Sequence, residues 1–300
     1  MTKGNDMAKI TMNQTVTFFG NVETDIRLAR EAGYDGIDLQ DPKLYRYLDR
    51  GFAPESLLPL LDGFEVSDIG SIQNIEREGE GAEELMAEVR RMSELAALYG
   101  AKYIQLCTGP GRWDVVNDYA AGRLAADDPR YRGFLGRDER EMIDVTAANV
   151  RRAADIAAEY GVEIYVEPLA WTPLNRCSQI LQVLEKADRG NVGLAVDTWQ
   201  FYSAGDTPED AAALPAELIK IVHVSDGLYL DPATTVADMG VYRNVILGGG
   251  VIPLQEWIDA IKSTGFDGWY CPEIFSDRAA EQDLAMIARL MHDMVAVLIN

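Results

Sequence analysis

Short apolar segments alternate with longer amphipathic segments from one end of the chain to the other. The apolar segments include "GIDLQ" at 36–40, "EIYVEP" at 163–168 and "VGLAVDT" at 192–198. Their length and composition are typical of buried strands. In the longer segments, such as 82–100 and 137–161, apolar residues recur at helical spacing and a glycine follows the last of them. We count eight such strand-and-helix units along the chain.

This alternation predicts parallel strands joined by right-handed helical crossovers. Eight units in 300 residues match the size of a (β/α)8 TIM barrel. The competing α/β fold is an open doubly wound sheet, which commonly carries a G-x-G-x-x-G turn after its first strand. The segment "TVTFFGNVE" lacks that turn. We therefore predict one TIM-barrel domain over residues 1–300.

Two segments interrupt the alternation. Residues 108–137 form a long insertion after the fourth predicted strand, and residues 227–250 form another after the seventh. Loops longer than about 12–15 residues are commonly lids or binding loops. Both insertions follow the carboxyl ends of strands, which is the face where barrel active sites are built.

The charge balance narrows the choice of partners. The chain has 27 lysines and arginines against 49 aspartates and glutamates, for a formal net charge of −22. Such a surface repels phosphate backbones and anionic lipids, so nucleic acid and membrane are unfavourable partners. No apolar stretch approaches the roughly 18–20 residues that span a bilayer. We expect a small-molecule substrate instead.

The cysteines and the start of the chain indicate the compartment. The three cysteines are scattered and form no C-x-x-C pair, which is typical of a reducing cytoplasm. The opening residues "MTKGNDMAKI" lack the apolar core of a signal peptide. We therefore expect a soluble cytoplasmic protein.

The last four predicted strands each end near a residue that can bind a metal ion. These residues are Glu167, Asp197, His223 and Glu273. Taken alone, each has a structural explanation, because a lone histidine in a strand is commonly a core residue and an aspartate before a threonine can cap a turn. Neighbouring parallel strands bring all four to one rim, however, and three carboxylates there repel one another unless a cation neutralises them. Oxygen ligands with one nitrogen predict one divalent ion, Mn²⁺ before Mg²⁺ or Co²⁺.

At this point the chain resembles a known family. The motifs "VEP", "VDTW", "HVSD" and "GWYCPEIFS" occur in this order and are similar to those of the xylose isomerase-like TIM barrels. Within them the chain resembles the sugar phosphate isomerase/epimerase group, which includes ketose 3-epimerases, inosose isomerases and inosose dehydratases. The resemblance covers nearly the whole chain, and it is specific to the superfamily rather than to a substrate. It also implies a homo-oligomer.

The resemblance implies a reaction at a carbon beside a carbonyl group. In such enzymes the metal binds two adjacent sugar oxygens, and the two glutamates flank the carbon that exchanges a proton. Glu167 and Glu273 would then be both metal ligands and an acid/base pair. We expect a metal-dependent isomerase or epimerase of a keto-sugar or related polyol, acting through an enediolate.

Three alternatives stay open or are disfavoured. A lyase of the same superfamily, such as an inosose dehydratase or an enzyme that cleaves 3-keto-glycosides as part of a complex, would use the same pair of glutamates. A metal-binding partner subunit without turnover is a second possibility. A DNA-repair endonuclease on this barrel holds three zinc ions with several histidines, and a chain with two histidines and a charge of −22 is a poor match.

Further residues near the same rim are candidates for substrate contact. Arg243 resembles an arginine that touches substrate oxygens in relatives, although a salt bridge is the alternative. Gln200 replaces the histidine of a D-T-x-H motif found in many relatives, and glutamine cannot carry a proton at neutral pH. Asp226 either positions His223 or a substrate, or belongs to a turn. Aromatic residues that follow strand ends, and could form apolar walls for a sugar, are Trp113, Trp171, Trp199 and Phe18.

Overall fold

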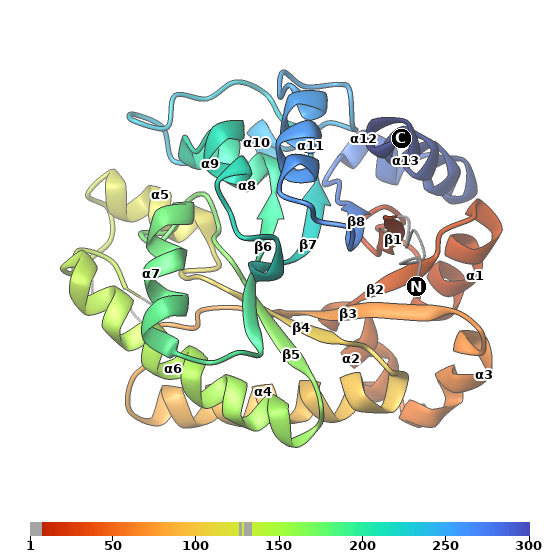
Figure 1. The fold of residues 1–300 in the computed structure, drawn as a ribbon, viewed down its shortest axis with the longest axis horizontal. Coiled ribbons are helices and arrows are strands. Elements are labelled where there is room, and N and C mark those ends of the chain that lie inside the picture. The colour runs from red at the N-terminus through yellow and green to blue at the C-terminus, as the bar shows by residue number, and fades with distance from the viewer. Residues whose placement is uncertain (1–7, 126–127, 129–133) are drawn as a thin grey trace, which may run out of the picture.

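The computed structural model describes residues 8–125, 128 and 134–300. Within them, eight parallel strands pair in sequence order, and the last strand pairs with the first to close a barrel. The helices lie around the outside of these strands (Figure 1). This confirms the predicted (β/α)8 TIM barrel.

The strands are short, as expected for a barrel of this class. Their bounds are β1 Lys9–Asn13, β2 Gly36–Gln40, β3 Glu65–Ile72, β4 Tyr103–Cys107, β5 Glu163–Glu167, β6 Val192–Asp197, β7 Ile219–Val224 and β8 Trp269–Pro272.

The helices differ widely in length. Their bounds are α1 Val22–Ala32, α2 Asp41–Asp49, α3 Leu58–Leu61, α4 Glu80–Tyr99, α5 Trp113–Ala120, α6 Glu139–Glu159, α7 Cys177–Ala187, α8 Thr198–Ala204, α9 Pro208–Ala212, α10 Met239–Tyr242, α11 Leu254–Ser263, α12 Asp277–Ala280 and α13 Leu284–Ile299, with 3₁₀ turns at Pro54–Leu57 and Ala216–Leu218.

Two helices begin directly at strand ends where the apolar pattern does not predict them. Helix α2 starts after β2, and the amphipathic segment at 53–63 forms a 3₁₀ turn followed by the four-residue α3. Helix α8 starts after β6, where the Asp197 side chain accepts hydrogen bonds from the backbone N–H groups of Trp199 and Gln200. Such capping stabilises the start of a helix. Helix α8 has only seven residues, which is too short for a helical pattern of apolar residues to be recognised in the sequence.

The two predicted insertions contain short helices. The segment after β4 holds α5, and residues 126–127 and 129–133 of this insertion lie outside the described residues. The segment after β7 holds α10. Around the barrel, α4 lies beside α6, and α13 lies beside α1 (Figure 1). None of the described helices is long and apolar enough to cross a membrane.

A buried ion pair fixes the loop that follows β1. The Lys43 ammonium group donates to Asp25 Oδ2 at 2.8 Å and to the backbone oxygens of Gln14 and Thr17 at 2.9 and 2.8 Å. The side chains of Gln14 and Thr17 donate in turn to the Asp25 carboxylate, each at 2.7 Å. Asp25 and Lys43 are both buried. This network ties the loop to α1 and α2.

Replacing one member of this pair should destabilise the barrel. In the Asp25→Ala variant the Lys43 ammonium group stays buried without its counter-charge, so we expect the free energy of unfolding to fall by about 3–5 kcal/mol. Urea denaturation measures this change. Glu31→Ala is the control, because Glu31 forms an exposed pair with Arg27 on the same helix and should cost less than about 0.5 kcal/mol. Equal effects of the two substitutions would contradict this interpretation.

Candidate metal centre

Strand alternation brings the four predicted donors to the carboxyl end of the barrel. Each donor lies two residues after a residue whose side chain is in the barrel interior, along the same strand or just past its end. Because side chains alternate between the two faces of a strand, residues two apart point to the same side, and each donor therefore also faces inward. The pairs are Tyr165 and Glu167, Ala195 and Asp197, Ile221 and His223, and Cys271 and Glu273. The register of the sheet also sets Asp197 beside His223.

The four donors form one compact cluster. One possible ligand atom from each of Glu167, Asp197, His223 and Glu273 lies within 4.8 Å of the others. His223 Nδ1 is 3.3 Å from Glu167 Oε2, 3.6 Å from Glu273 Oε2 and 4.0 Å from Asp197 Oδ2. All four residues are buried. The structure thus brings together all the residues that the sequence analysis proposed as ligands.

The histidine shows that this donor set fits a cation. Both ring nitrogens of His223 are buried and have no hydrogen-bond partner among the described residues. Buried polar atoms almost always have a partner, and an orphaned one calls for an explanation such as an ion. Three carboxylate oxygens and one imidazole nitrogen are a suitable ligand set for a divalent metal ion.

Arg243 supplies positive charge to the cluster. Its Nη2 donates to Asp197 Oδ2 at 2.5 Å, to Glu273 Oε2 at 2.6 Å and to Ser225 Oγ at 2.5 Å. The guanidinium carbon lies 5.1 Å from the ring centroid of Trp199 and 4.7 Å from that of Phe275. These contacts hold a buried arginine in place.

Burial and these charges shift the pKa values in different directions. Burial raises the pKa of Glu273 to about 7, although Arg243 and His223 oppose the rise. Burial would also raise the pKa of Asp197, but Arg243 and His223 outweigh it and the pKa lies below its usual value. Burial lowers the pKa of His223, yet Glu167 and Glu273 raise it well above the usual value. The site thus holds carboxyl groups of unequal acidity.

A cavity of about 630 Å³ opens above the cluster. Its floor includes Glu167, Glu273, Arg243 and Gln200. The amide of Gln200 accepts a hydrogen bond from the backbone of Ala170 at 2.7 Å and approaches Glu167 Oε1 at 3.5 Å. The Gln200 side chain is therefore held in place beside Glu167.

Three of the four predicted aromatic residues line this cavity, namely Phe18, Trp113 and Trp171. Phe18 is about half exposed, and Trp171 is buried with its Nε1 donating to the backbone oxygen of Pro110 at 2.8 Å. The cavity thus has an apolar wall above a charged floor, which is suited to a ligand with both polar and apolar faces.

Trp199 and Asp226 lie outside the cavity wall. Trp199 is fully buried behind Arg243. Both oxygens of Asp226 accept backbone N–H groups, from Gly227 at 2.8 Å, Gly250 at 2.9 Å and Ile252 at 3.2 Å. Asp226 therefore fixes the loop after β7. The positions of both residues argue against the direct substrate contact that the sequence suggested.

The sequence analysis missed the polar residues of the first half of the barrel. Asp38 on β2 and Asp68 on β3 are fully buried inside the barrel. Asn13 Nδ2 donates to Asp38 at 2.5 Å, and the Tyr165 hydroxyl donates to Asp68. The sequence did offer a sign of these residues, because an acidic residue stands inside each of the apolar segments "GIDLQ" and "FEVSDIG". The cavity also has polar wall residues from this half: Gln14, Gln40, Lys43, Arg46 and Gln105.

Comparison with known proteins identifies the family. The model of the xylose isomerase-like TIM barrel matches residues 26–291. The chain belongs to this family. Its fold is also similar to that of a crystal structure of IolI with a bound zinc atom, with a TM-score of 0.82, 20% identity and coverage of 97% of this chain and 98% of the other.

Relatives of this xylose isomerase-like barrel are enzymes with several reactions. An inosose isomerase of Bacillus velezensis is 26% identical over 89% of this chain and 88% of its own length. A ketose 3-epimerase of Arthrobacter globiformis is 22% identical over 92% of this chain and 85% of its own. A 3-dehydroshikimate dehydratase of Pseudomonas aeruginosa is 24% identical over 88% of this chain but only 37% of its own length. The relatives thus include isomerases, an epimerase and dehydratases.

Removing the positive charge of Arg243 should destabilise this barrel when chelator keeps divalent ions away. In the Arg243→Met variant, Asp197 and Glu273 lose their buried partner, so we expect the free energy of unfolding to fall by about 3–5 kcal/mol. Urea denaturation in EDTA measures it. Arg152→Met is the control, since Arg152 pairs with Glu83 at the surface. An Arg243→Met barrel as stable as the wild type would show that the cluster does not depend on this charge.

Proposed function

We propose that the chain is a divalent-metal-dependent isomerase or epimerase of a keto-sugar or related polyol. The observation that carries this proposal is the cluster of Glu167, Asp197, His223 and Glu273 within 4.8 Å, of which Glu167 and Glu273 line a cavity of about 630 Å³. The inosose isomerase and ketose 3-epimerase relatives support the reaction class. A small sugar is the proposed substrate.

The four clustered residues are the proposed ligands of one metal ion. Three of them offer hard carboxylate oxygens, which favours Mn²⁺ over softer ions, with Mg²⁺ and Co²⁺ as substitutes. When bound, such an ion supplies a Lewis acid that polarises a substrate carbonyl group. The zinc atom in the IolI structure supports a divalent ion in general.

Glu167 and Glu273 are the proposed acid/base pair. They come from β5 and from the residue after β8, and both line the cavity. The amide groups of Gln105 and Gln200 hold Glu167, while Arg243 holds Glu273. One carboxylate removes the proton beside the carbonyl to give an enediolate. Either the carboxylic acid of the other glutamate then delivers its proton to the opposite face of the same carbon, or the first glutamate delivers its proton to the adjacent carbon while a hydroxyl proton passes between the two substrate oxygens. The first outcome is epimerisation, and the second is isomerisation.

Other cavity residues are proposed to bind the substrate. Arg243 and Gln200 offer N–H groups to hydroxyl oxygens, since both line the cavity floor. Phe18, Trp113 and Trp171 offer apolar surface on which a sugar ring can pack. The Gln200 amide binds without transferring a proton.

A dehydratase is the second candidate function. The relatives include a 3-dehydroshikimate dehydratase and an inosose dehydratase, and loss of a β-hydroxyl from the same enediolate needs only the same two carboxylates. Mass spectrometry distinguishes the reactions, because a dehydratase product is lighter than its substrate by one water molecule.

We further propose that the protein is a cytoplasmic homo-oligomer. The three buried free cysteines support a reducing compartment.

Exchange of substrate hydrogen with solvent tests the acid/base pair. With Mn²⁺ and a panel of ketoses and inososes in deuterated water, the wild type should incorporate deuterium beside the carbonyl group. Glu273→Gln keeps the shape of the side chain but not its basicity, so exchange should slow by about 10²–10⁴-fold. Nuclear magnetic resonance follows the exchange.

Glu163→Gln is the matched control for this experiment. Glu163 lies at the opposite end of β5 from Glu167 and pairs with Lys220 at 2.9 Å. This variant should retain the wild-type exchange rate. Undiminished exchange in Glu273→Gln would refute the proposed role of Glu273.

Metal analysis tests the ligand set separately. The purified wild type, loaded with Mn²⁺ and freed of excess ion, should retain about one ion per chain, the occupancy of a mononuclear site. Asp197→Asn removes one charged ligand and should weaken Mn²⁺ binding at least tenfold. Loss of a residue that only hydrogen-bonds to a ligand already weakens metal binding by about 10–100-fold, so loss of a direct ligand should cost at least as much. Isothermal titration calorimetry measures this. Wild-type affinity in Asp197→Asn would exclude Asp197 as a ligand.

A further inference from the structure

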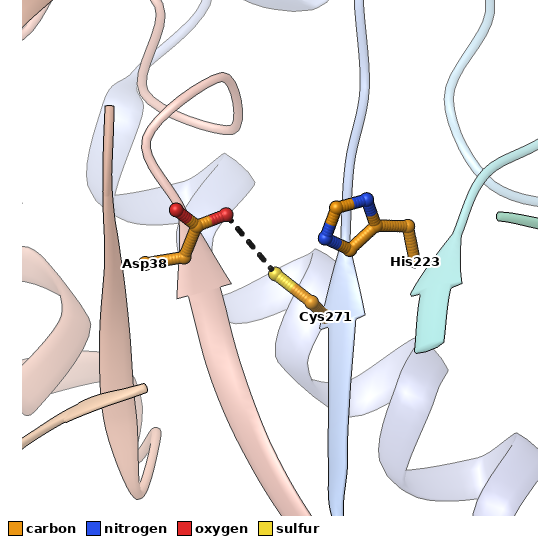
Figure 2. Close-up of side chains that lie close together, drawn as sticks. All are labelled: Asp38, His223 and Cys271. Atoms are coloured by element: carbon orange, nitrogen blue, oxygen red, sulfur yellow. Dashed lines mark hydrogen bonds between the residues drawn. The ribbon is translucent and has the colours of Figure 1, made fainter. Parts of the chain in front are cut away.

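His223 has a second buried face, which the proposed metal centre does not use. Its Nδ1 faces Glu167, Glu273 and Asp197. Figure 2 shows the other ring nitrogen directed to the opposite side, toward the side chains of Asp38 and Cys271. That nitrogen, Nε2, is fully buried and has no hydrogen-bond partner among the described residues. A buried imidazole nitrogen without a partner is costly.

The three side chains lie at ligand distance from one another. One donor atom each from Asp38, His223 and Cys271 lies within 4.8 Å of the others, and all three residues are fully buried. Cys271 Sγ is 3.8 Å from Asp38 Oδ2. For metal–ligand bonds of about 2.0–2.3 Å, donor atoms around one tetrahedral ion are separated by about 3.5 Å, so this spacing suits a shared ion.

The sheet register makes this grouping a fixed part of the barrel. His223 on β7 is the direct neighbour of Cys271 on β8. On the other side, Asp38 is in register with Asn13 of β1, whose amide donates to Asp38 at 2.5 Å. The donors therefore belong to regular strands rather than to loops, and their positions are set by backbone pairing.

The charge around the trio also favours a cation. Asp38 and Asp68 are both buried in this layer, and within the described chain neither forms an ion pair with a lysine or an arginine. Asp38 accepts hydrogen bonds from Asn13 and Gln40, and Asp68 accepts them from Ser67 and Tyr165. These donors are neutral, so a cation would add the counter-charge that they do not supply. Arg243 contacts Asp197 and Glu273 in the layer above, and it makes no such contact with Asp38.

We infer that Asp38, Cys271 and His223 form a second cation site, selective for a thiophilic divalent ion such as Zn²⁺ or Co²⁺. The inference rests on the proposed function in one respect, because His223 is shared with the proposed metal centre. Binding forms one bond from the ion to the Cys271 sulfur, one to His223 Nε2 and one to a carboxylate oxygen of Asp38, and it replaces the hydrogen bond from the Cys271 thiol to Asp38. The thiol proton and the Nε2 proton pass to solvent, so the ring bridges two ions as an imidazolate. Thiolate ligands favour Zn²⁺ or Co²⁺ over Mn²⁺.

Cobalt titration of the metal-free 300-residue chain tests this inference. The wild type should bind about two Co²⁺ ions per chain, and a thiolate-to-cobalt charge-transfer absorption should appear in the near ultraviolet. Cys271→Ser should bind about one ion and lose the absorption. Cys177→Ser is the matched control, because Cys177 is an equally buried thiol in α7; this variant should behave as the wild type.

The outcomes separate this inference from the proposed function. One Co²⁺ per chain without thiolate absorption in the wild type would overturn the second site and leave the proposed centre intact. Absorption that persists in Cys271→Ser would also overturn it, since another thiol would then be the ligand. No bound ion in the wild type would refute both. Asp38→Asn gives a second test that keeps the thiol, and loss of the second ion there is the expected result. Circular dichroism verifies that each variant is folded.

Discussion

Burial of like charges around one histidine is the constraint on which this structure depends. Oxygens of Glu167, Glu273 and Asp197 lie 3.3, 3.6 and 4.0 Å from His223 Nδ1. The donor atoms of the cluster lie within 4.8 Å of one another, so ionised carboxylates at this buried site repel one another. The arrangement persists because the side chains project from paired strands that cannot move apart independently. Arg243 supplies part of the compensating charge. The proposed metal ion would supply the rest of that charge.

The sequence alone was sufficient for the barrel and for this cluster. Alternating apolar and amphipathic segments predicted the eight parallel strands, and the donors stood at the ends of the last four strands, where parallel pairing must bring them together. Strand ends are visible in a sequence because an apolar segment stops there. The four donors were predicted for this reason, whereas Gln200 and Arg243 were predicted from the resemblance to the family.

Other features depend on contacts that periodicity does not reveal. Helix α8 is capped by Asp197, which the sequence pattern assigned only to the end of the preceding strand. Trp199 follows a strand end, as a cavity residue would, but the turn of α8 buries its ring behind Arg243. Asp38 and Asp68 stand within strands, and their inward direction follows only from the register of the closed sheet. For Trp199, Asp38 and Asp68, the direction of the side chain in the folded barrel decides its role, and residue type alone does not predict that direction.

The two halves of the barrel contribute differently to the cavity. The proposed metal ligands come from β5 to β8, whereas much of the opposite wall comes from the segments after β1 and β2, including Phe18, Lys43 and Arg46. The Asp25–Lys43 network anchors those segments to α1 and α2 without touching the ligands. Amino-acid replacements on that wall can therefore change the shape of the cavity while the half that carries the proposed ligands keeps its arrangement. If the proposed function holds, such a division would let the choice of substrate change without altering the proposed ligands.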